Sequence, residues 1–114
     1  MKIAVCIKQV PDTEAKFKIG ADGRSMDETG VNLVVNPFDE YAVEEGLRLR
    51  EKHGGEVVAY AVGDDRAATA LRTVLAMGAD RAVHLKDAAF EGSDGLGISR
   101  ILAAALRPES FDLV

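Results

Sequence analysis

The sequence predicts an α/β domain built on a parallel sheet. Apolar runs of strand length alternate with runs whose apolar residues recur at helical spacing, in the order strand, excursion, helix, strand, helix, strand, helix, strand. The strand runs are apolar almost throughout, which is typical of strands buried on both faces of a parallel sheet. With 114 residues, the chain has the length of one domain with a single modest core.

The chain begins with a short strand and a long irregular segment. Residues Lys2–Lys8 form a mostly apolar run that predicts the first strand. Residues Pro11–Val35 are polar, and three glycines break them into short extended pieces at 16–19 and 31–35. This composition predicts an irregular excursion or a hairpin between the first strand and the first helix.

The first predicted helix spans about residues 38–52. Asn36 can accept hydrogen bonds from the first free backbone N–H groups, and Pro37 stands where a helix can spare its own N–H. Acidic residues gather toward the N-terminal end and basic residues toward the C-terminal end, and Glu44 can pair with Arg48 one turn later. The expected apolar face contains Phe38, Ala42, Val43, Gly46 and Leu47.

A second strand and helix follow the same logic. Gly54-Gly55 end the first helix, and residues 57–62 form the next strand-like run. An aspartate of the pair Asp64-Asp65 can cap a helix over 66–77, which Gly78 ends. The buried face expected for this helix consists of Ala67, Ala70, Leu71, Val74 and Leu75.

The last predicted elements are a short strand at 81–86 and a helix that follows a loop at 92–95. Pro108 ends this helix region, and the apolar run from Phe111 to Val114 has the character of a fourth strand at its beginning. No turn or polar tail follows that run, so we expect a domain truncated after the start of its fourth core strand. The apolar stripe of the last helix contains Ile98, Ile101, Leu102, Ala105 and Leu106.

Composition argues against several classes of partner. The 14 Lys and Arg residues are outnumbered by 19 Asp and Glu residues, which gives a net charge of −5 and no basic cluster of the kind that nucleic acid or an anionic membrane attracts. No apolar run approaches the roughly 20 residues of a membrane-spanning helix, so we expect no membrane insertion. A lone cysteine, Cys6, allows no disulfide framework, which favours a reducing compartment such as the cytoplasm or an organelle matrix.

The strand order also predicts where a ligand would bind. In parallel sheets ligands bind at the carboxyl ends of the strands, where this chain places Cys6 to Val10, Val62-Gly63 and Asn36. A crevice of backbone groups and small apolar side chains there would suit an adenine ring. Any α/β domain carries glycines and a helix cap at its strand ends, so these residues alone favour a purely structural interpretation.

Known phosphate-binding and catalytic patterns are missing from the sequence. There is no G-x-x-x-x-G-K-[ST] loop and no G-x-G-x-x-G between a strand and a helix, and Asp64-Asp65 would repel a phosphate. The run Gly92–Gly97 lacks a lysine and contains Asp94, so we interpret it as a loop and helix cap. Neither His53 nor His84 has partner spacing for a metal site or a nucleophile pair, and both are interpreted as structural.

Three segments in order resemble one family. They are Val5-Cys6-Ile7-Lys8-Gln9-Val10-Pro11-Asp12, then Asn36-Pro37-Phe38-Asp39-Glu40-Tyr41-Ala42-Val43-Glu44-Glu45, and then Leu71-Arg72-Thr73-Val74-Leu75-Ala76-Met77-Gly78-Ala79-Asp80-Arg81-Ala82. They resemble the N-terminal part of the electron transfer flavoprotein beta subunit, also called the FixA-type family, over essentially the whole chain. The resemblance implies a Rossmann-like domain of the adenine nucleotide alpha hydrolase-like type, with residues 1–114 as the N-terminal part of one nucleotide-binding domain.

The resemblance also implies a function. The beta subunit pairs with an alpha subunit that holds most of the FAD, and the heterodimer carries electrons from flavin-dependent dehydrogenases to a quinone oxidoreductase or another acceptor. It acts in the cytoplasm, or in the mitochondrial matrix of a eukaryote. The beta subunit binds AMP, or a second FAD in bifurcating members. Carried over position by position, the nucleotide contacts fall on Cys6, Asn36, Pro37, Phe38, Asp39 and Val62. Cys6 departs from the alanine often found at its position.

The family's phosphate-holding loop would begin just beyond Val114. We therefore expect the 114-residue piece alone to bind AMP weakly or not at all and to bind no measurable FAD, because charge-assisted hydrogen bonds to the phosphate are each worth about 1.5–3 kcal/mol. Micromolar AMP affinity in a titration of the isolated piece would refute that expectation.

Two other functions remain open from the sequence. A free-standing adenine-nucleotide-binding module of the stress-protein type shares this architecture, and a glycine-rich run ending in Ser or Thr after residue 114 would favour it. An ATP-cleaving relative would carry a Ser-Gly-Gly loop after the first strand, where this chain has Lys8-Gln9-Val10-Pro11-Asp12. That difference disfavours the ATP-cleaving alternative.

Overall fold

A computed structural model describes residues 1–114 and contains a three-stranded parallel sheet in the order β1-β4-β5. β1 (Lys2–Ile7) pairs with β4 (Glu56–Val62), and β4 pairs with β5 (Arg81–Leu85). The register sets Cys6 beside Tyr60 and Ile7 beside Ala61, so the carboxyl ends of β1 and β4 lie at one edge of the sheet. The predicted parallel α/β fold is confirmed, with strand bounds within one or two residues of those expected.

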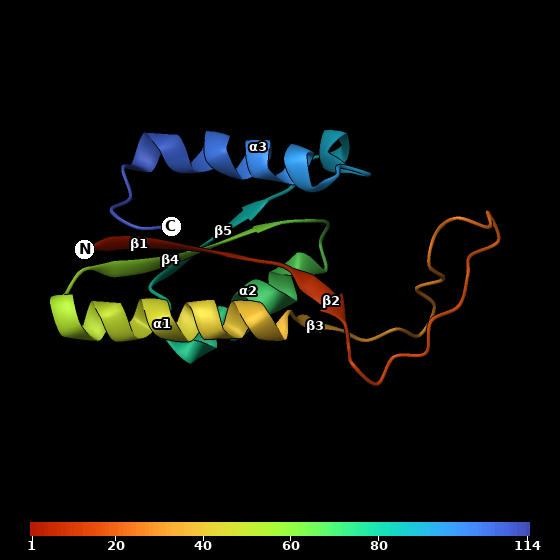
Figure 1. Cartoon of the computed structure of the whole chain (residues 1–114), viewed down its shortest axis with the longest axis horizontal. Helices are drawn as coiled ribbons and strands as arrows, with labels where there is room; N and C mark the ends of the chain where they lie inside the picture. Colours follow the sequence, from red (N-terminus) through yellow and green to blue (C-terminus); the bar gives the residue numbers. More distant parts are fainter.

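Helices cover both faces of the sheet (Figure 1). α1 (Pro37–His53) and α2 (Ala67–Met77) lie together on one face, and α3 (Gly95–Leu106) lies on the other. Two single-turn 3₁₀ helices complete the set, η1 (Ala88–Phe90) before α3 and η2 (Arg107–Glu109) after it. The sequence predicted the three α-helices but neither of these short turns.

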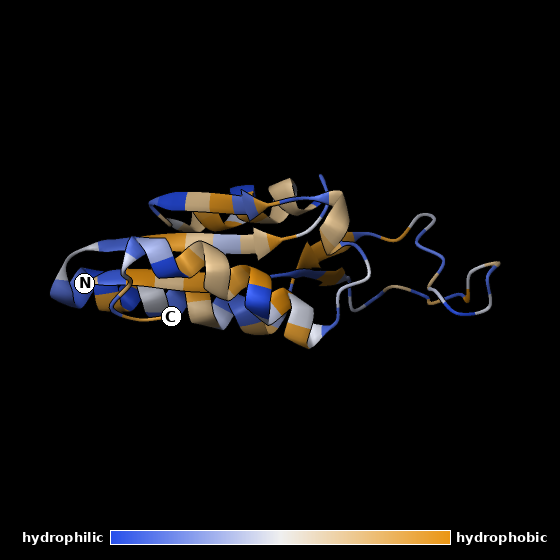
Figure 2. Ribbon diagram, turned by 90° about the horizontal axis from the view of Figure 1, so that it is seen from above, coloured by the Kyte–Doolittle hydropathy of each residue, from blue (hydrophilic) through white to orange (hydrophobic).

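The sheet separates two apolar clusters, because alternate strand residues face opposite sides. The larger cluster lies under α1 and α2 and includes Val43, Val57 and Val74, which are fully buried. The smaller one lies under α3, where Ala4, Val58 and Tyr60 are buried against its partly buried apolar residues. Figure 2 shows that the strands are largely apolar and that the helices are of mixed hydropathy.

Three expected core positions are in fact exposed. Phe38 is 80% exposed and Leu75 is 40% exposed, and Ala42 also faces solvent. Helical spacing placed these residues on the buried faces, and that prediction is wrong, because the sheet contacts a narrower strip of each helix than the apolar residues span. In α1 the buried residues are Val43, Gly46 and Leu47.

The predicted fourth strand is present only as a single parallel bridge between Leu113 and Ile3. The Ala4 amide donates to the Leu113 carbonyl at 2.9 Å, and the Asp112 amide donates to the Lys2 carbonyl at 2.9 Å. The run from 111 to 114 is too short to form more pairs. Its position is nevertheless informative, because it extends the sheet on the side of β1 opposite to β4.

A polar network at the amino end of the sheet holds the segment that leads from α3 to Leu113. The Glu109 carboxylate accepts hydrogen bonds from the Tyr60 hydroxyl at 2.9 Å and from Lys2 Nζ at 3.0 Å, and it also pairs with Arg81. These donors lower the pKa of Glu109 to about 2, the Arg81 hydrogen bond being the largest cause. The Tyr60 ring meets the Phe111 ring edge-on, with centroids 5.8 Å apart. The segment leading to Leu113 is thus tied to β1, β4 and β5.

The glycine-dotted excursion is a hairpin at its base and irregular beyond it. β2 (Gln9–Pro11) and β3 (Leu33–Val35) pair antiparallel, which confirms the hairpin alternative at its base. The extended piece expected at 16–19 forms no strand and has only an isolated bridge between Ile19 and Met26. Between them, residues 12–32 extend away from the body of the domain in both ribbon views (Figures 1 and 2). An ion pair between Glu28 and Arg66 links this arm to the start of α2.

No helix of this chain combines the length and the apolar character that crossing a membrane requires.

Candidate functional site

The carboxyl end of β1 is the topological switch point of the sheet. From β1 the chain reaches β4 on one side, whereas Leu113 returns to the other side after α3 has crossed the opposite face. Open α/β sheets bind ligands outside the carboxyl ends of the strands at such a point. A groove of about 360 Å³ runs along the edge of β1 opposite to β4, between α1 and the last residues of the chain. Its lining is mostly apolar and includes Ala4, Cys6, Ala42, Leu49, Leu113 and Val114.

Asp39 connects the end of β1 to the start of α1. Its Oδ2 accepts a hydrogen bond from the Lys8 backbone amide at 2.8 Å, and its Oδ1 accepts one from Asn36 Nδ2 at 3.1 Å. The backbone N–H of Asn36 in turn donates to the Lys8 carbonyl at 2.9 Å. Three of the predicted site elements, the strand end, Asn36 and Asp39, therefore form one hydrogen-bonded unit.

The structure corrects the expected capping role of the Asn36 side chain. Asn36 is the N-cap of α1, but its side chain makes no hydrogen bond to the free backbone amides of the first turn. Its backbone carbonyl instead accepts from the Asp39 and Glu40 amides, at 2.9 and 3.2 Å. The Asn36 Nδ2 group donates to the Asp39 carboxylate, and the Oδ1 atom accepts no hydrogen bond from the first turn of α1.

Cys6 lies half-buried beside this unit. Its side chain faces the α3 side of the sheet, where it packs against the cluster formed by Ala4, Val58 and Tyr60. Burial raises the pKa of the Cys6 thiol, and the negative charge of Asp39 raises it further. A neutral thiol of this size can line a pocket for an uncharged ring, whereas a nucleophile would need the opposite shift.

Pro37 and Phe38 occupy the exposed first turn of α1. Pro37 stands at the first helical position, where its missing N–H costs nothing, as predicted. The Phe38 side chain projects to solvent, and the residue is 80% exposed. These two residues share the location of the site but not the hydrogen-bonded unit formed by Asn36 and Asp39.

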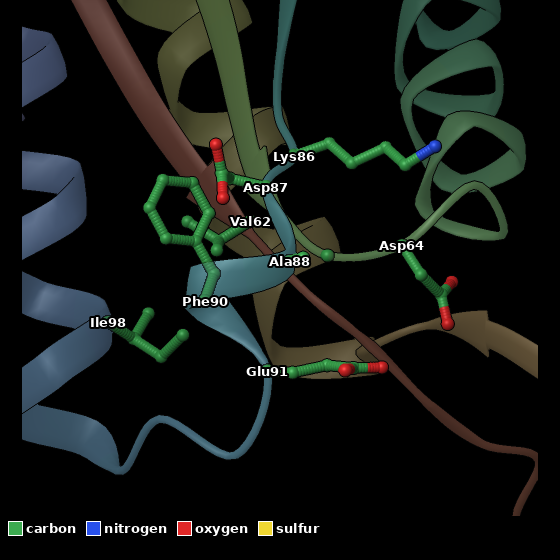
Figure 3. Close-up of a pocket in the computed structure, with 9 residues that line it drawn as sticks. Val62, Asp64, Lys86, Asp87, Ala88, Phe90, Glu91 and Ile98 are labelled. Atoms are coloured by element: carbon green, nitrogen blue, oxygen red, sulfur yellow. The ribbon is translucent and has the colours of Figure 1, made fainter.

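Val62 ends β4 and lines a second cavity of about 350 Å³ (Figure 3). Figure 3 shows Val62, Phe90 and Ile98 on one side of this cavity, where the Asp87 carboxylate also lies, and the carboxylates of Asp64 and Glu91 on the other. Lys86 also lines it, and its Nζ pairs with Asp65 at 2.5 Å. The cavity therefore has an apolar wall and an acidic rim, which suits an uncharged ring better than a phosphate.

Sequence reasoning missed the residues that η1 and α3 contribute to this second cavity. Phe90 arrives there through a 3₁₀ turn that Asp87 caps by accepting from the Ala89 amide at 2.8 Å. Asp87 followed by a small-residue pair was the only local signal for that turn. The interpretation of Asp94 as a helix cap is confirmed, since it accepts from the Gly97 amide at 2.8 Å.

His84 also has a structural place. It lies on β5, and its Nε2 is 2.9 Å from the carbonyl of Gly63 at the end of β4. The carbonyl can only accept, so this ring nitrogen carries the proton. The contact holds the β4 turn against β5 at the wall of the second cavity, as the structural interpretation of this histidine expected.

Comparison with known proteins places these features in one family. Residues 24–114 match the family model described as the electron transfer flavoprotein domain. The chain is 45% identical over 107 residues to Protein FixA of Azorhizobium caulinodans, which covers 94% of this chain and 38% of that relative. It is 42% identical over 114 residues to the electron transfer flavoprotein subunit beta of Thermoanaerobacterium thermosaccharolyticum, and 40% identical over 115 residues to that of Bacillus subtilis. Each of these two matches covers the whole chain and 44% of the relative.

The chain thus spans about two fifths of the length of these curated relatives.

Proposed function

Because this chain belongs to the electron transfer flavoprotein family, we propose that it forms part of the beta subunit of a heterodimeric electron carrier. Its partner is an alpha subunit. The complex takes electrons from flavin-dependent dehydrogenases and passes them to a quinone oxidoreductase or another acceptor. Such a subunit is a carrier and not an enzyme with its own substrate. The match of 40 to 45% identity to relatives named FixA or subunit beta is the observation that carries this proposal.

We further propose that the crevice at the carboxyl end of β1 binds AMP as a structural group. The support is the cluster of Cys6, Asn36 and Asp39 at the switch point, beside an apolar groove that can cover the faces of an adenine ring. Pro37, Phe38 and Val62 complete the proposed contact set. In a bifurcating complex a second FAD would occupy the same place.

FAD, held mainly by the alpha subunit, would supply the redox chemistry of the complex. The residues of this chain have another task, which is to hold and orient a nucleotide at the edge of the sheet. The acidic rim at Asp64 and Glu91 leaves the second cavity unsuited to a phosphate, so we place the charged end of the nucleotide away from Val62.

Residues 1–114 would be the N-terminal part of one nucleotide-binding domain that works in the cytoplasm, or in the matrix of a mitochondrion. A single cysteine that can form no internal disulfide agrees with such a reducing compartment. The net charge of −5 favours protein partners over nucleic acid.

The proposal is tested by purifying the complete subunit together with its alpha partner and counting extracted flavin and AMP per heterodimer. One FAD and one AMP support the ordinary carrier, and two FAD support the bifurcating type. A subunit that copurifies with no alpha partner and releases no adenine nucleotide would refute the proposal. The variant Tyr41→Phe, on the exposed face of α1, serves as a matched control for the loss of nucleotide during purification. Tyr41 is 75% exposed and lies outside the proposed contact set.

A further inference from the structure

We propose that Asp39 is a positioning residue that fixes the Asn36 amide, so that the Asn36 oxygen selects a hydrogen-bond donor on the uncharged nucleoside part of the bound nucleotide. This inference rests on the proposed AMP site and deepens it. It also changes the role of Asp39, which the family resemblance presents as a nucleotide contact.

Both oxygens of the Asp39 carboxylate are already engaged within the chain. Oδ2 accepts from the Lys8 amide at 2.8 Å, and Oδ1 accepts from Asn36 Nδ2 at 3.1 Å. These bonds join the backbone of Lys8, directly after β1, to the N-cap of α1. A carboxylate engaged in this way acts on a ligand mainly through the groups that it orients.

The carboxylate determines which end of the Asn36 amide faces it. An ionised carboxylate has acceptors and no donors, so only the NH₂ end of the amide can be directed toward it. The carbonyl Oδ1, at the opposite end of the planar amide group, then points away from the carboxylate. It makes no capping bond to the first turn of α1, and Asn36 is only partly buried. Oδ1 is therefore a fixed acceptor that receives no hydrogen bond from this chain.

An acceptor beside a carboxylate selects a particular ligand chemistry. Phosphate oxygens are acceptors with negative charge, and they would be repelled by both Oδ1 and Asp39. A donor would bind well, and a nucleoside offers two kinds: the exocyclic amine of adenine and the sugar hydroxyls. The shared chemistry is an uncharged hydrogen-bond donor, and the two sources can be separated with nucleotide analogues.

Three variants of the complete subunit, purified with its partner and stripped of nucleotide, test the inference. In Asp39→Asn the new amide can keep the Lys8 bond through its oxygen, but it presents NH₂ to Asn36, which must then reverse. Asn36→Ala removes the Oδ1 acceptor and leaves the hydrogen bond from the Lys8 amide to Asp39 in place. The double variant reports whether Asp39 acts through Asn36. Glu40→Gln is the matched control, because it removes one negative charge from an exposed side chain in the same helical turn.

Calorimetric titration with AMP, IMP, 2′-deoxy-AMP and 3′-deoxy-AMP gives the readout. We expect Asp39→Asn and Asn36→Ala each to weaken AMP binding roughly tenfold, and Asp39→Asn to cost nothing further in the Asn36→Ala background. If the donor is the exocyclic amine, Asp39→Asn will reverse the preference of AMP over IMP, since IMP has an acceptor there. If the donor is a sugar hydroxyl, one of the two deoxy analogues will bind the unmodified protein more weakly than AMP does. The Asp39→Asn substitution will then not weaken the binding of that analogue any further.

The inference is overturned if Asp39→Asn weakens AMP equally with and without Asn36, because Asp39 would then contact the ligand directly. It is also overturned if Asp39→Asn binds AMP as tightly as Glu40→Gln does. Should Asp39→Asn fail to fold, Asn36→Ala with unchanged AMP affinity overturns it instead. Failure of the unmodified complex to bind any of the four nucleotides refutes the proposed function, and that outcome is distinct from binding with an unchanged preference.

Discussion

Replacing Val43 with alanine tests the packing that holds α1, and with it Asn36 and Asp39, against the sheet. Val43 is completely buried between α1 and the strands, and it belongs to the larger apolar cluster. The change removes two buried methyl groups, worth about 1.6 kcal/mol in transfer free energy at about 0.8 kcal/mol each. A cavity that only partly collapses adds up to about 1 kcal/mol, and the better helix propensity of alanine returns about 0.5 kcal/mol.

The free energy of unfolding should therefore fall by about 2 kcal/mol, which corresponds to a drop of roughly 8 °C in Tm for a chain of this size. Urea unfolding followed by circular dichroism measures the change. Tyr41→Ala is the matched control on the same helix: it removes a larger side chain that is 75% exposed, so it should cost less than about 0.5 kcal/mol. Equal losses for the two variants would show that the assigned face of α1 is wrong.

Three further predictions follow from particular contacts. Hydrogen bonds from Arg81, Lys2 and Tyr60 lower the pKa of Glu109 to about 2. The stabilisation that the ionised Glu109 provides is therefore complete above the ordinary pKa of 4.5 and is lost as the pH falls toward 2. In that window the Tm should change less with pH in Glu109→Gln than in the unmodified protein. Gly55→Ala should lower Tm more than Gly54→Ala does, since both have positive φ but only a Cβ at Gly55 would lie 1.8 Å from the Met1 carbonyl oxygen. Cys6 should react slowly with iodoacetamide at pH 8, and Asp39→Asn should speed the reaction more than Glu40→Gln, because removing the Asp39 charge lowers the pKa of the thiol. A rate that both variants leave equal would contradict that assignment.

Much of the fold could be predicted because its signals are local. Apolar runs predicted β1, β4 and β5, and helical periodicity predicted α1, α2 and α3 within one or two residues. Periodicity could not separate Val43 from its exposed neighbour Ala42, since the width of the buried strip depends on how the helix lies on the sheet. It also could not reveal η1, whose single turn is too short to have a period.

The site was only partly predictable for a related reason. The switch point follows from strand order, and residue types marked Asn36 as the helix start. The direction of the Asn36 amide, however, is set by Asp39, and the end of β1 enters the same network through the Lys8 backbone, which no side-chain pattern reveals. Residue spacing indicates which side chains are close together, but the hydrogen bonds that they form depend on three-dimensional contacts.

Photolabelling of the complete subunit with 2-azido-AMP, followed by peptide mapping, tests the central claim most directly. If an adenine nucleotide binds at the switch point, the label will be found on peptides that contain Cys6 to Lys8, Asn36 to Asp39, or Val62, and excess AMP will suppress it. Label confined to the arm at 12–32 or to α3, with none at the end of β1, would contradict the nucleotide site described here.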